Sequence, residues 1–251
     1  MAPTLIAVHS RIAGRCAAAA LVGLSSACAS YSTFKEAHPI DAGTFRFDLA
    51  MSGVSAAPKS GAVPFMVGGN DPPRSSTLPD LELQFRWGIA HGFDLGLKTN
   101  LSSIEVNGTV QILRGDSFEL AAAPAFQGAV GINGDDKGWS MALLKLPFLT
   151  GMRFGESGRH ELVLGPALAK SWGRGNEGYP MDALFAGGTI GVAFAAARIG
   201  RVMPELAIYT VLAGNGVPLP GNVVRVSPDV GGGRPVLIQA GVAFSFGSGS
   251  R

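Results

Sequence analysis

The chain has 251 residues and a formal net charge of +2, and only 15% of its residues are charged. This balance excludes the strong positive field that nucleic-acid binding requires, so we expect no nucleic-acid partner. Mean hydropathy is +0.28, yet no run reaches the roughly 20 apolar residues of a membrane-spanning helix. An apolar chain without such a run is compatible with a β-barrel in lipid.

The N-terminus, Met1–Ala27, resembles a bacterial secretory signal peptide. Arg11 and Arg15 form a basic region, and Cys16–Leu24 form a short apolar core that small residues follow. Basic, apolar and small-residue regions in this order are typical of such signals. We therefore expect residues 1–27 to be absent from the mature protein.

The end of this signal is similar to that of a bacterial lipoprotein. Leu24-Ser25-Ser26-Ala27-Cys28 resembles its cleavage motif, although Ser25 stands where that family usually has leucine. The resemblance implies lipidation of Cys28, and ordinary cleavage after Ala29 is the alternative. Removal of residues 1–27 leaves Cys28 as the only cysteine, which excludes an intrachain disulfide. The next residues, 28–43, are polar and irregular, and we interpret them as a periplasmic tether.

The first predicted strand, Thr44–Ser52, is recognised by apolar residues at every second position. An irregular segment, Gly53–Pro79, rich in Gly, Pro and Ser, follows it. The clearest pattern comes next, because Leu81–Ala90 and Phe93–Leu101 both alternate between apolar and polar residues. A period of two predicts strands, and Gly92 suits a short hairpin loop. The hairpin therefore has one apolar and one polar face.

Seven further strands follow from alternation and intervening turn residues. We expect them at Ile104–Ile112, Phe118–Gly128, Trp139–Phe154, Glu161–Trp172, Leu184–Ala197, Met203–Leu212 and Pro235–Gly247. The parity of Trp139–Phe154 is blurred, which could reflect a β-bulge. Connections are mostly short after even-numbered strands and long after odd-numbered ones. About ten strands with this alternation predict an all-β protein, a transmembrane antiparallel up-and-down β-barrel over residues 44–247.

The last strand carries the most specific motif. Gln239, Gly241, Phe244 and Phe246 are similar to the C-terminal assembly signal of outer-membrane barrels, with residues 248–251 extending beyond it. The whole chain resembles the small outer-membrane barrel lipoproteins of Gram-negative bacteria. The resemblance implies localisation in the outer membrane, with membrane lipids and the barrel assembly machinery as partners. An even strand number would place both chain ends, and a lipidated Cys28, on the periplasmic side.

The polar faces of the predicted strands carry charges of both signs. If these faces line a lumen, they bring together Arg46, Asp48, Glu82, Arg86, Asp94, Lys98, Glu105, Glu119 and Glu205. Arg86 is diagonal to both Asp94 and Lys98 in the hairpin, a separation that long side chains span. We interpret the set as a structural network that fills a narrow lumen, with a selective pore lining as the alternative. Small residues on the same side, Ala121, Ala123, Gly165 and Ala167, leave room for a narrow water path.

Signs of catalysis are few. The mature histidines, His38, His91 and His160, lack metal-ligand spacing, and we place none in an external loop. The glycine runs at 68–69 and 231–233 do not open a helix after a strand, so no phosphate loop is indicated, and we expect no cofactor, metal or enzymatic activity. We expect a structural or adhesive barrel, or one for narrow small-solute passage. The alternatives are a periplasmic lipocalin-like lipoprotein that binds an apolar ligand, and a barrel enzyme acting on lipid or peptide.

Overall fold

The computed structural model describes residues 30–57, 80–132, 138–175, 178, 180–196, 200–219, 222–225 and 236–247. The predicted signal peptide, Cys28 and the extension at residues 248–251 lie outside these ranges. Strands make up nearly all of the described chain. Their bounds are β1 Phe45–Ala57, β2 Asp80–Ala90, β3 Phe93–Thr99, β4 Ser103–Arg114, β5 Phe118–Ala122, β6 Ala125–Ile132, β7 Gly138–Phe154, β8 His160–Arg174, β9 Pro180–Ala196, β10 Gly200–Gly214, β11 Gly216–Leu219, β12 Asn222–Arg225 and β13 Val236–Gly247, with a 3₁₀ turn at Glu156–Gly158.

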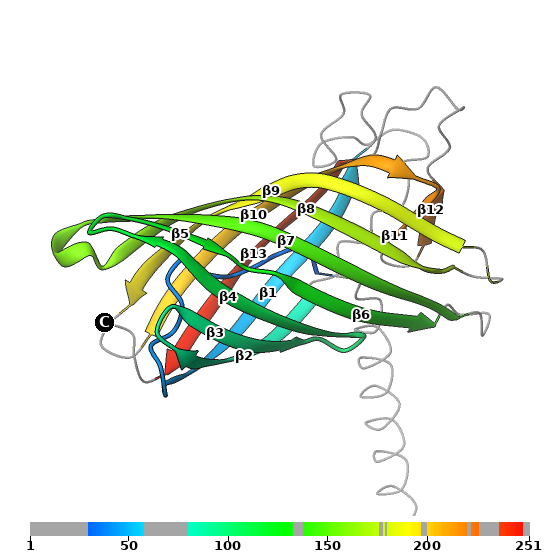
Figure 1. The fold of residues 1–251 in the computed structure, drawn as a ribbon. Helices are drawn as coiled ribbons and strands as arrows, with labels where there is room; N and C mark the ends of the chain where they lie inside the picture. Colours follow the sequence, from blue (N-terminus) through cyan, green and yellow to red (C-terminus); the bar gives the residue numbers. More distant parts are fainter. Residues whose placement is uncertain are drawn as a thin grey trace, which may run out of the picture.

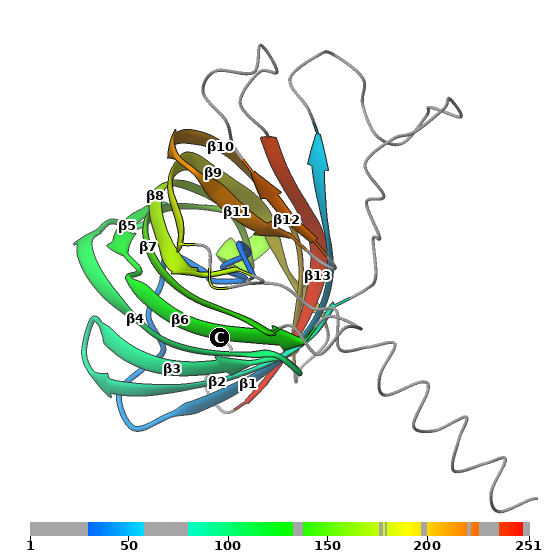
Figure 2. The ribbon, with the colours of Figure 1, turned by 90° about the vertical axis from the view of Figure 1, so that its right-hand side faces the viewer.

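The strands close into an antiparallel up-and-down barrel (Figures 1 and 2). Neighbouring strands of the ring follow one another along the chain, apart from the separate hairpin β11–β12, and β13 pairs with both β10 and β1, which completes the ring. β5 and β6 both lie between β4 and β7, so they are two parts of one strand, and the ring has the expected ten. The predicted fold class is confirmed.

Four details differ from the prediction. β1 continues to Ala57, through the first residues of the segment expected to be irregular. The expected strand Phe118–Gly128 is interrupted at Ala123 and Pro124, because proline has no N–H for the ladder. The predicted loop after β10 contains the short hairpin β11–β12. The blurred strand, β7, keeps one register with β8 from Ser140 to Phe154, so no bulge is present in this pair. Its parity was obscured because its inward positions near Trp139 are also apolar.

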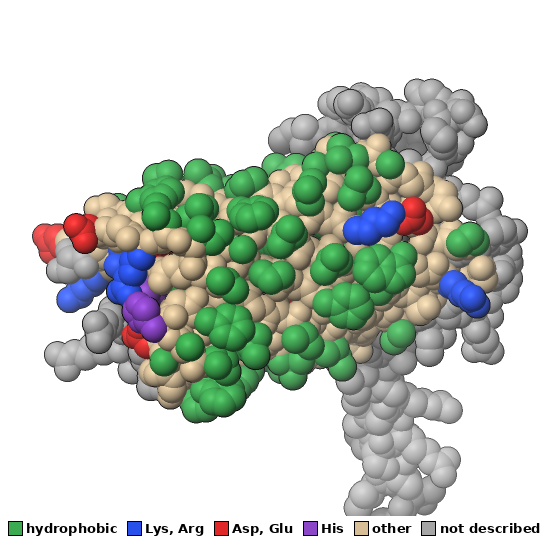
Figure 3. Space-filling model, in the orientation of Figure 1, with side chains coloured by type: hydrophobic (Ala, Val, Ile, Leu, Met, Phe, Trp, Pro, Cys, Tyr) green, Lys and Arg blue, Asp and Glu red, His purple; other side chains and the backbone are tan. Residues whose placement is uncertain are grey.

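The apolar face of the strands points outward. In β2 and β3, Leu83, Phe85, Trp87, Leu95 and Leu97 are 40–49% exposed, whereas Glu82, Arg86, Asp94 and Lys98 are at most 3% exposed. Apolar side chains cover most of the outer wall in Figure 3, and the charged ones lie toward its two ends. This arrangement is the reverse of a soluble barrel with an apolar interior, which counts against the lipocalin-like alternative.

The two ends of the barrel differ. At the short-turn end, β1 begins, β13 ends, and β2–β3, β4–β5 and β7–β8 are connected; we call the opposite end the long-loop end. Aromatic side chains project outward at the short-turn end, as in the interfacial girdle of an outer-membrane barrel. They are Phe45, Trp87, Phe118, Phe154, Phe194 and Phe246. No described helix is long and apolar enough to cross a membrane. The closed ladder and the outward apolar belt identify a barrel of the outer membrane.

The N-terminal residues before β1 are inside the barrel. Ser30 to Ile40 form no regular structure, and nearly all of them are buried. Figure 2 shows this part of the chain within the ring of strands. For these residues, the interpretation as a free periplasmic tether is wrong. Their polar, irregular sequence suits the lumen because wall side chains, rather than a β-ladder, satisfy their backbone groups. We call Ser30–Asp41 the inner segment.

Candidate functional site: the occupied lumen

The first residues of the inner segment bind side chains near mid-barrel, toward the long-loop end. Gln239 Oε1 accepts hydrogen bonds from the backbone N–H groups of Tyr31, at 2.6 Å, and Ser32, at 3.0 Å. Lys145 Nζ donates to Ser30 O at 2.9 Å, and Lys98 Nζ donates to Ser32 O at 3.0 Å. Side chains from three strands therefore satisfy the backbone of this short stretch.

The next step of the inner segment is centred on Glu205 of β10. Its Oε1 accepts from Thr33 N at 2.7 Å, and its Oε2 accepts from Phe34 N at 2.8 Å. The Thr33 hydroxyl also donates to Glu205, at 2.8 Å. Phe34 has a φ of +44°, a left-handed conformation that is unfavourable for a bulky residue. Its ring packs with Ala50 and Ala243 and passes so close to Gly241 that a Cβ there would lie 2.8 Å from Phe34 Cζ.

Glu36 joins the inner segment to two strands by ion pairs. Its carboxylate lies 3.0 Å from Arg46 Nη1 of β1 and 2.7 Å from Arg201 Nη1 of β10. Arg46 also bonds to Asp48 at 3.0 Å and donates to Ser245 Oγ at 2.8 Å. Buried ions need such partners, because an unpaired charge in the lumen would lose its hydration without compensation.

The segment leaves the lumen through a ring of charged residues at the short-turn end. The ring, which we call the mouth ring, consists of Arg46, Asp94, Glu119, Arg153, Glu161 and Arg201. Glu161 Oε1 accepts from Ala37 N at 2.9 Å, and Asp94 Oδ2 accepts from Ile40 N at 3.0 Å. His38 Nδ1 lies 3.1 Å from Glu119, which also binds Arg153. The order of all these contacts shows that the chain runs from mid-lumen to the short-turn end.

The nine charged residues expected in the lumen all lie inside the barrel in the structure. Arg86 bonds with Asp94, one of its two diagonal neighbours. Lys98, the other, lies 3.1 Å from Glu82 and 3.4 Å from Glu105. The network thus has a centre on β2, β3 and β4 that is separate from the ion pairs of Glu36.

Sequence reasoning missed several lumen residues. Lys145 lies 2.7 Å from Glu105 but sits on the strand with blurred parity. Arg153, Glu161 and Arg201 belong to the mouth ring. The signal that could have found them is positional: Arg46, Asp94, Glu119, Glu161 and Arg201 are each the second residue of a strand that starts at the short-turn end.

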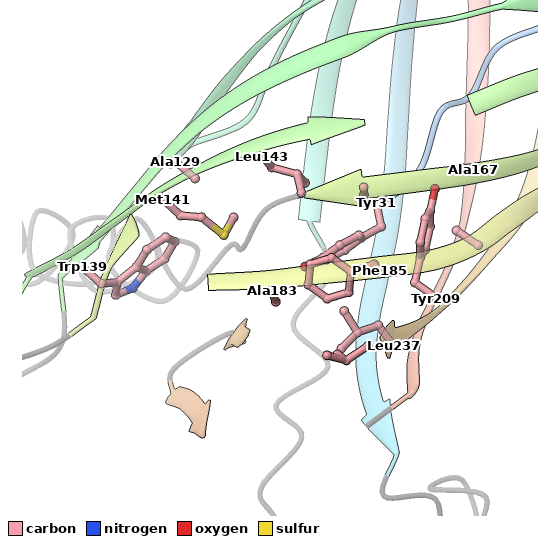
Figure 4. Packing of buried hydrophobic residues seen from close by; sticks show 13 residues of the cluster. Tyr31, Ala129, Trp139, Met141, Leu143, Ala167, Ala183, Phe185, Tyr209 and Leu237 are labelled. Atoms are coloured by element: carbon pink, nitrogen blue, oxygen red, sulfur yellow. The ribbon is translucent and has the colours of Figure 1, made fainter. Parts of the chain in front are cut away.

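Toward the long-loop end, the lumen changes character. A buried cluster there brings together Tyr31 of the inner segment with apolar residues of β6 to β10 and β13 (Figure 4). The ring of Tyr31 lies 5.6 Å from that of Phe185 and 5.4 Å from that of Tyr209. Trp139, Met141 and Leu143 continue the cluster along β7. The start of the inner segment therefore packs, through Tyr31, against an apolar surface.

The four residues of the predicted assembly signal divide between the two faces of β13. Phe244 and Phe246 are 42% and 47% exposed on the outer face. Gln239 and Gly241 face the lumen and contact the inner segment. These two positions therefore also have a local structural role, and the signal itself stays a prediction.

The histidines lie near the short-turn end of the described structure. His38 is in the lumen beside Glu119. His91 is in the β2–β3 turn, and its Nε2 lies 3.4 Å from Arg114 Nη1. His160 begins β8 and packs against Phe154 and Phe194. Within the described ranges, no group of His, Cys, Asp and Glu is arranged to hold a metal ion.

Comparison with known proteins finds solved structures whose fold is similar to that of this chain. No family model and no curated protein matches the sequence. Among solved structures, the chain is similar to the outer membrane protease OmpT of Escherichia coli, with 7% identity, 87% of this chain and 100% of that chain covered, and a TM-score of 0.48. It is also similar to the translocator domain of the autotransporter NalP of Neisseria meningitidis, with 11% identity, 96% of each chain covered and a TM-score of 0.39. Neisserial surface protein A is 11% identical, with 79% of this chain and 95% of that chain covered and a TM-score of 0.36. The fold assignment rests on the strand pairing of this chain.

Proposed function

We propose that this protein is a non-enzymatic outer-membrane barrel that is closed at rest by its own inner segment. Its role would be structural or adhesive, with small-solute passage limited to what the filled lumen admits. The observation that supports this most directly is the bonding of Ser30–Ile40 to side chains all around the lumen. A barrel of about ten strands has little interior beyond side-chain volume, and here a backbone occupies part of it.

The test is conductance of the purified protein in planar bilayers. We expect wild-type protein to be silent or to show only rare, small openings. The variant Glu36→Ala/Glu205→Ala removes the acidic groups that bind two N–H groups and two arginines, so its openings should be larger and more frequent. The matched control is Asp182→Ala, an acid that is 50% exposed outside the lumen. Steady, large, ion-selective currents from wild type would contradict closure and make the charged residues a selectivity lining.

We also propose that Cys28 carries a lipid. The support is the lipoprotein-like end of the signal and the absence of a second cysteine after cleavage. Labelling cells with an alkyne palmitate should mark wild type but not Cys28→Ser, and equal labelling of both would reject the idea. The described chain begins at Ser30, which lies beside Glu82 and Gln239, near the long-loop ends of β2 and β13.

Outer-membrane lipids and the barrel assembly machinery are the partners we propose. The outward apolar belt supports the first, and the motif on β13 supports the second. Photocrosslinking from Phe246 during assembly, compared with crosslinking from Phe126 on β6, would test the second partner. Equal capture at both positions would mean that the motif has no special part in recognition.

A further inference from the structure

The wall of the lumen binds the main chain of the inner segment at many points, in addition to its side chains. Four acceptor side chains, Gln239, Glu205, Glu161 and Asp94, bind backbone N–H groups between Tyr31 and Ile40. Two lysines, Lys98 and Lys145, donate to backbone carbonyls of Ser30 and Ser32. Every polypeptide has these N–H and C=O groups, so such contacts are compatible with many sequences.

The acceptors are distributed around and along the lumen. They come from β3, β8, β10 and β13, and they follow the path of the segment from mid-barrel to the mouth ring. A carboxylate that accepts backbone N–H bonds away from water makes the stronger, charge-assisted kind of hydrogen bond. If the inner segment leaves, Glu205, Glu161 and Asp94 each lose such donors, and an empty lumen would favour another ligand that supplies them.

Side chains of the inner segment fix its position along this path. Glu36 reaches Arg46 and Arg201 at the mouth ring. Near the other end, Ser30 Oγ donates to Glu82 at 2.9 Å. An acidic residue six positions after a small hydroxyl residue therefore matches the site. Between them, Tyr31 and Phe34 add ring contacts, and the Thr33 hydroxyl adds a hydrogen bond to Glu205.

We propose that the lumen is a binding site for an extended polypeptide, recognised through its backbone together with a few side chains, which the chain's own residues 30–41 occupy in cis. This inference rests on the proposed closure of the barrel. Its ligand class is a peptide of about ten residues with an acid near its middle. A peptide supplied in trans can take the place of the inner segment once the covalent link to β1 is cut.

The experiment begins with the complete folded protein. A recognition sequence for a site-specific protease is inserted after Ala42, in the exposed turn before β1. Cutting then converts the inner segment into a separate peptide without asking a truncated chain to fold. A synthetic peptide of residues 30–41, with a fluorophore after Asp41 where the chain leaves the lumen, is added and its binding followed by anisotropy. Uncut protein is the control for binding elsewhere.

We expect the labelled peptide to exchange into cut protein only. N-methylation at Phe34, which removes the N–H that Glu205 binds, should weaken binding by about tenfold or more, whereas N-methylation at Lys35 should have a smaller effect. Glu205→Ala should weaken binding of the unmodified peptide, and Asp182→Ala should not. A shuffled peptide that keeps glutamate at its seventh position should compete more weakly than the native one, because it keeps the main-chain contacts and the ion pairs of Glu36 but loses the ring contacts of Tyr31 and Phe34.

Three outcomes would overturn the proposal. They are no uptake of peptide by cut, still heat-modifiable protein; equal binding of the Phe34 and Lys35 N-methyl peptides; and unchanged peptide binding by Glu205→Ala. Closure is judged separately, by the conductance of uncut protein. If uncut protein is silent, the cut protein conducts and peptide does not return, closure stands and the peptide site is rejected. If uncut protein conducts steadily, closure itself is rejected.

Discussion

The two sides of the lumen wall differ in chemistry. On β1–β4, which we call the charged wall, the inward side chains are long and polar, with Glu82, Arg86 and Lys98 as examples. On β7–β10, the small-residue wall, many inward side chains are alanine, and these include Ala167, Ala169, Ala183, Ala193 and Ala207. The inner segment lies between them. The charged wall supplies an ionic network, and the alanines leave the space in which a backbone passes.

This difference explains how a barrel of ten strands holds a peptide. If both walls carried long side chains, they would fill an interior only slightly wider than that of an eight-stranded barrel. If both carried alanines, the lumen would lack partners for backbone groups. Lys145, Glu161 and Glu205 provide such partners at single positions on the small-residue wall.

The largest effect should come from separating the two walls where β13 joins them. Deletion of Gln239–Arg251 removes most of the ladders from β13 to β1 and to β10, so the chain should fail to reach the outer membrane and should be degraded in the periplasm. Phe246→Ala should also reduce assembly, but less than this deletion does. Heat-modifiable migration on a gel measures both. Deletion of residues 248–251 alone is the control and should leave assembly intact. Normal accumulation of the longer deletion would show that β13 is dispensable.

Next in size is the loss of a buried ion from the charged wall. Arg86→Ala leaves Asp94 buried beside an empty site, since both side chains are 0% exposed. Such a change costs about 3–5 kcal/mol of unfolding free energy. Urea unfolding in detergent measures it. Arg153→Ala on β7 is the matched variant, because that side chain is 30% exposed and its loss should cost about 1 kcal/mol or less. If Arg86→Ala and Arg153→Ala lowered the unfolding free energy equally, burial of the ion pair would not explain the stability of the charged wall.

The outer face of the charged wall offers a third test. Leu97→Arg places a charge on the lipid side, midway along the wall, and should cost about 2–4 kcal/mol. Leu101→Arg, in the turn at the long-loop end, should cost about 1 kcal/mol or less, because arginine there reaches the interface. Unfolding in lipid bilayers compares the two. If Leu97→Arg is as mild as Leu101→Arg, the outward face is not at the membrane centre.

The inward and outward faces of the charged wall were easier to predict from the sequence than those of the small-residue wall. A strand with polar residues on one side and apolar residues on the other shows its two faces directly, as in Leu81–Ala90. On the small-residue wall, alanine and glycine fit both lipid and lumen, so the alternation in β7 and β9 is weak. The bonding role of Lys145, on β7, was hidden for this reason.

The inner segment itself was not predictable from local pattern. Ser30–Asp41 has neither the period of a strand nor that of a helix, and its order comes from side chains far away in sequence, such as Gln239 and Glu205. Sequence reasoning did note spare volume in the lumen at Ala121 and Ala167. The structure shows that a backbone, rather than water alone, occupies the interior.

The smallest effect should come from filling space beside the inner segment. Ala243 and Ala50 pack around Phe34, so Ala243→Leu should cost about 1–3 kcal/mol by overpacking. Because the barrel is stiffer than the irregular inner segment, the added volume should displace Phe34 and raise the frequency of openings in planar bilayers. Phe34→Ala in the same chain removes the ring that the new leucine meets and should restore part of the stability and the silence. If the double variant is no more stable than Ala243→Leu alone, the strain lies between β13 and β1, and the inner segment does not depend on the volume beside Ala243.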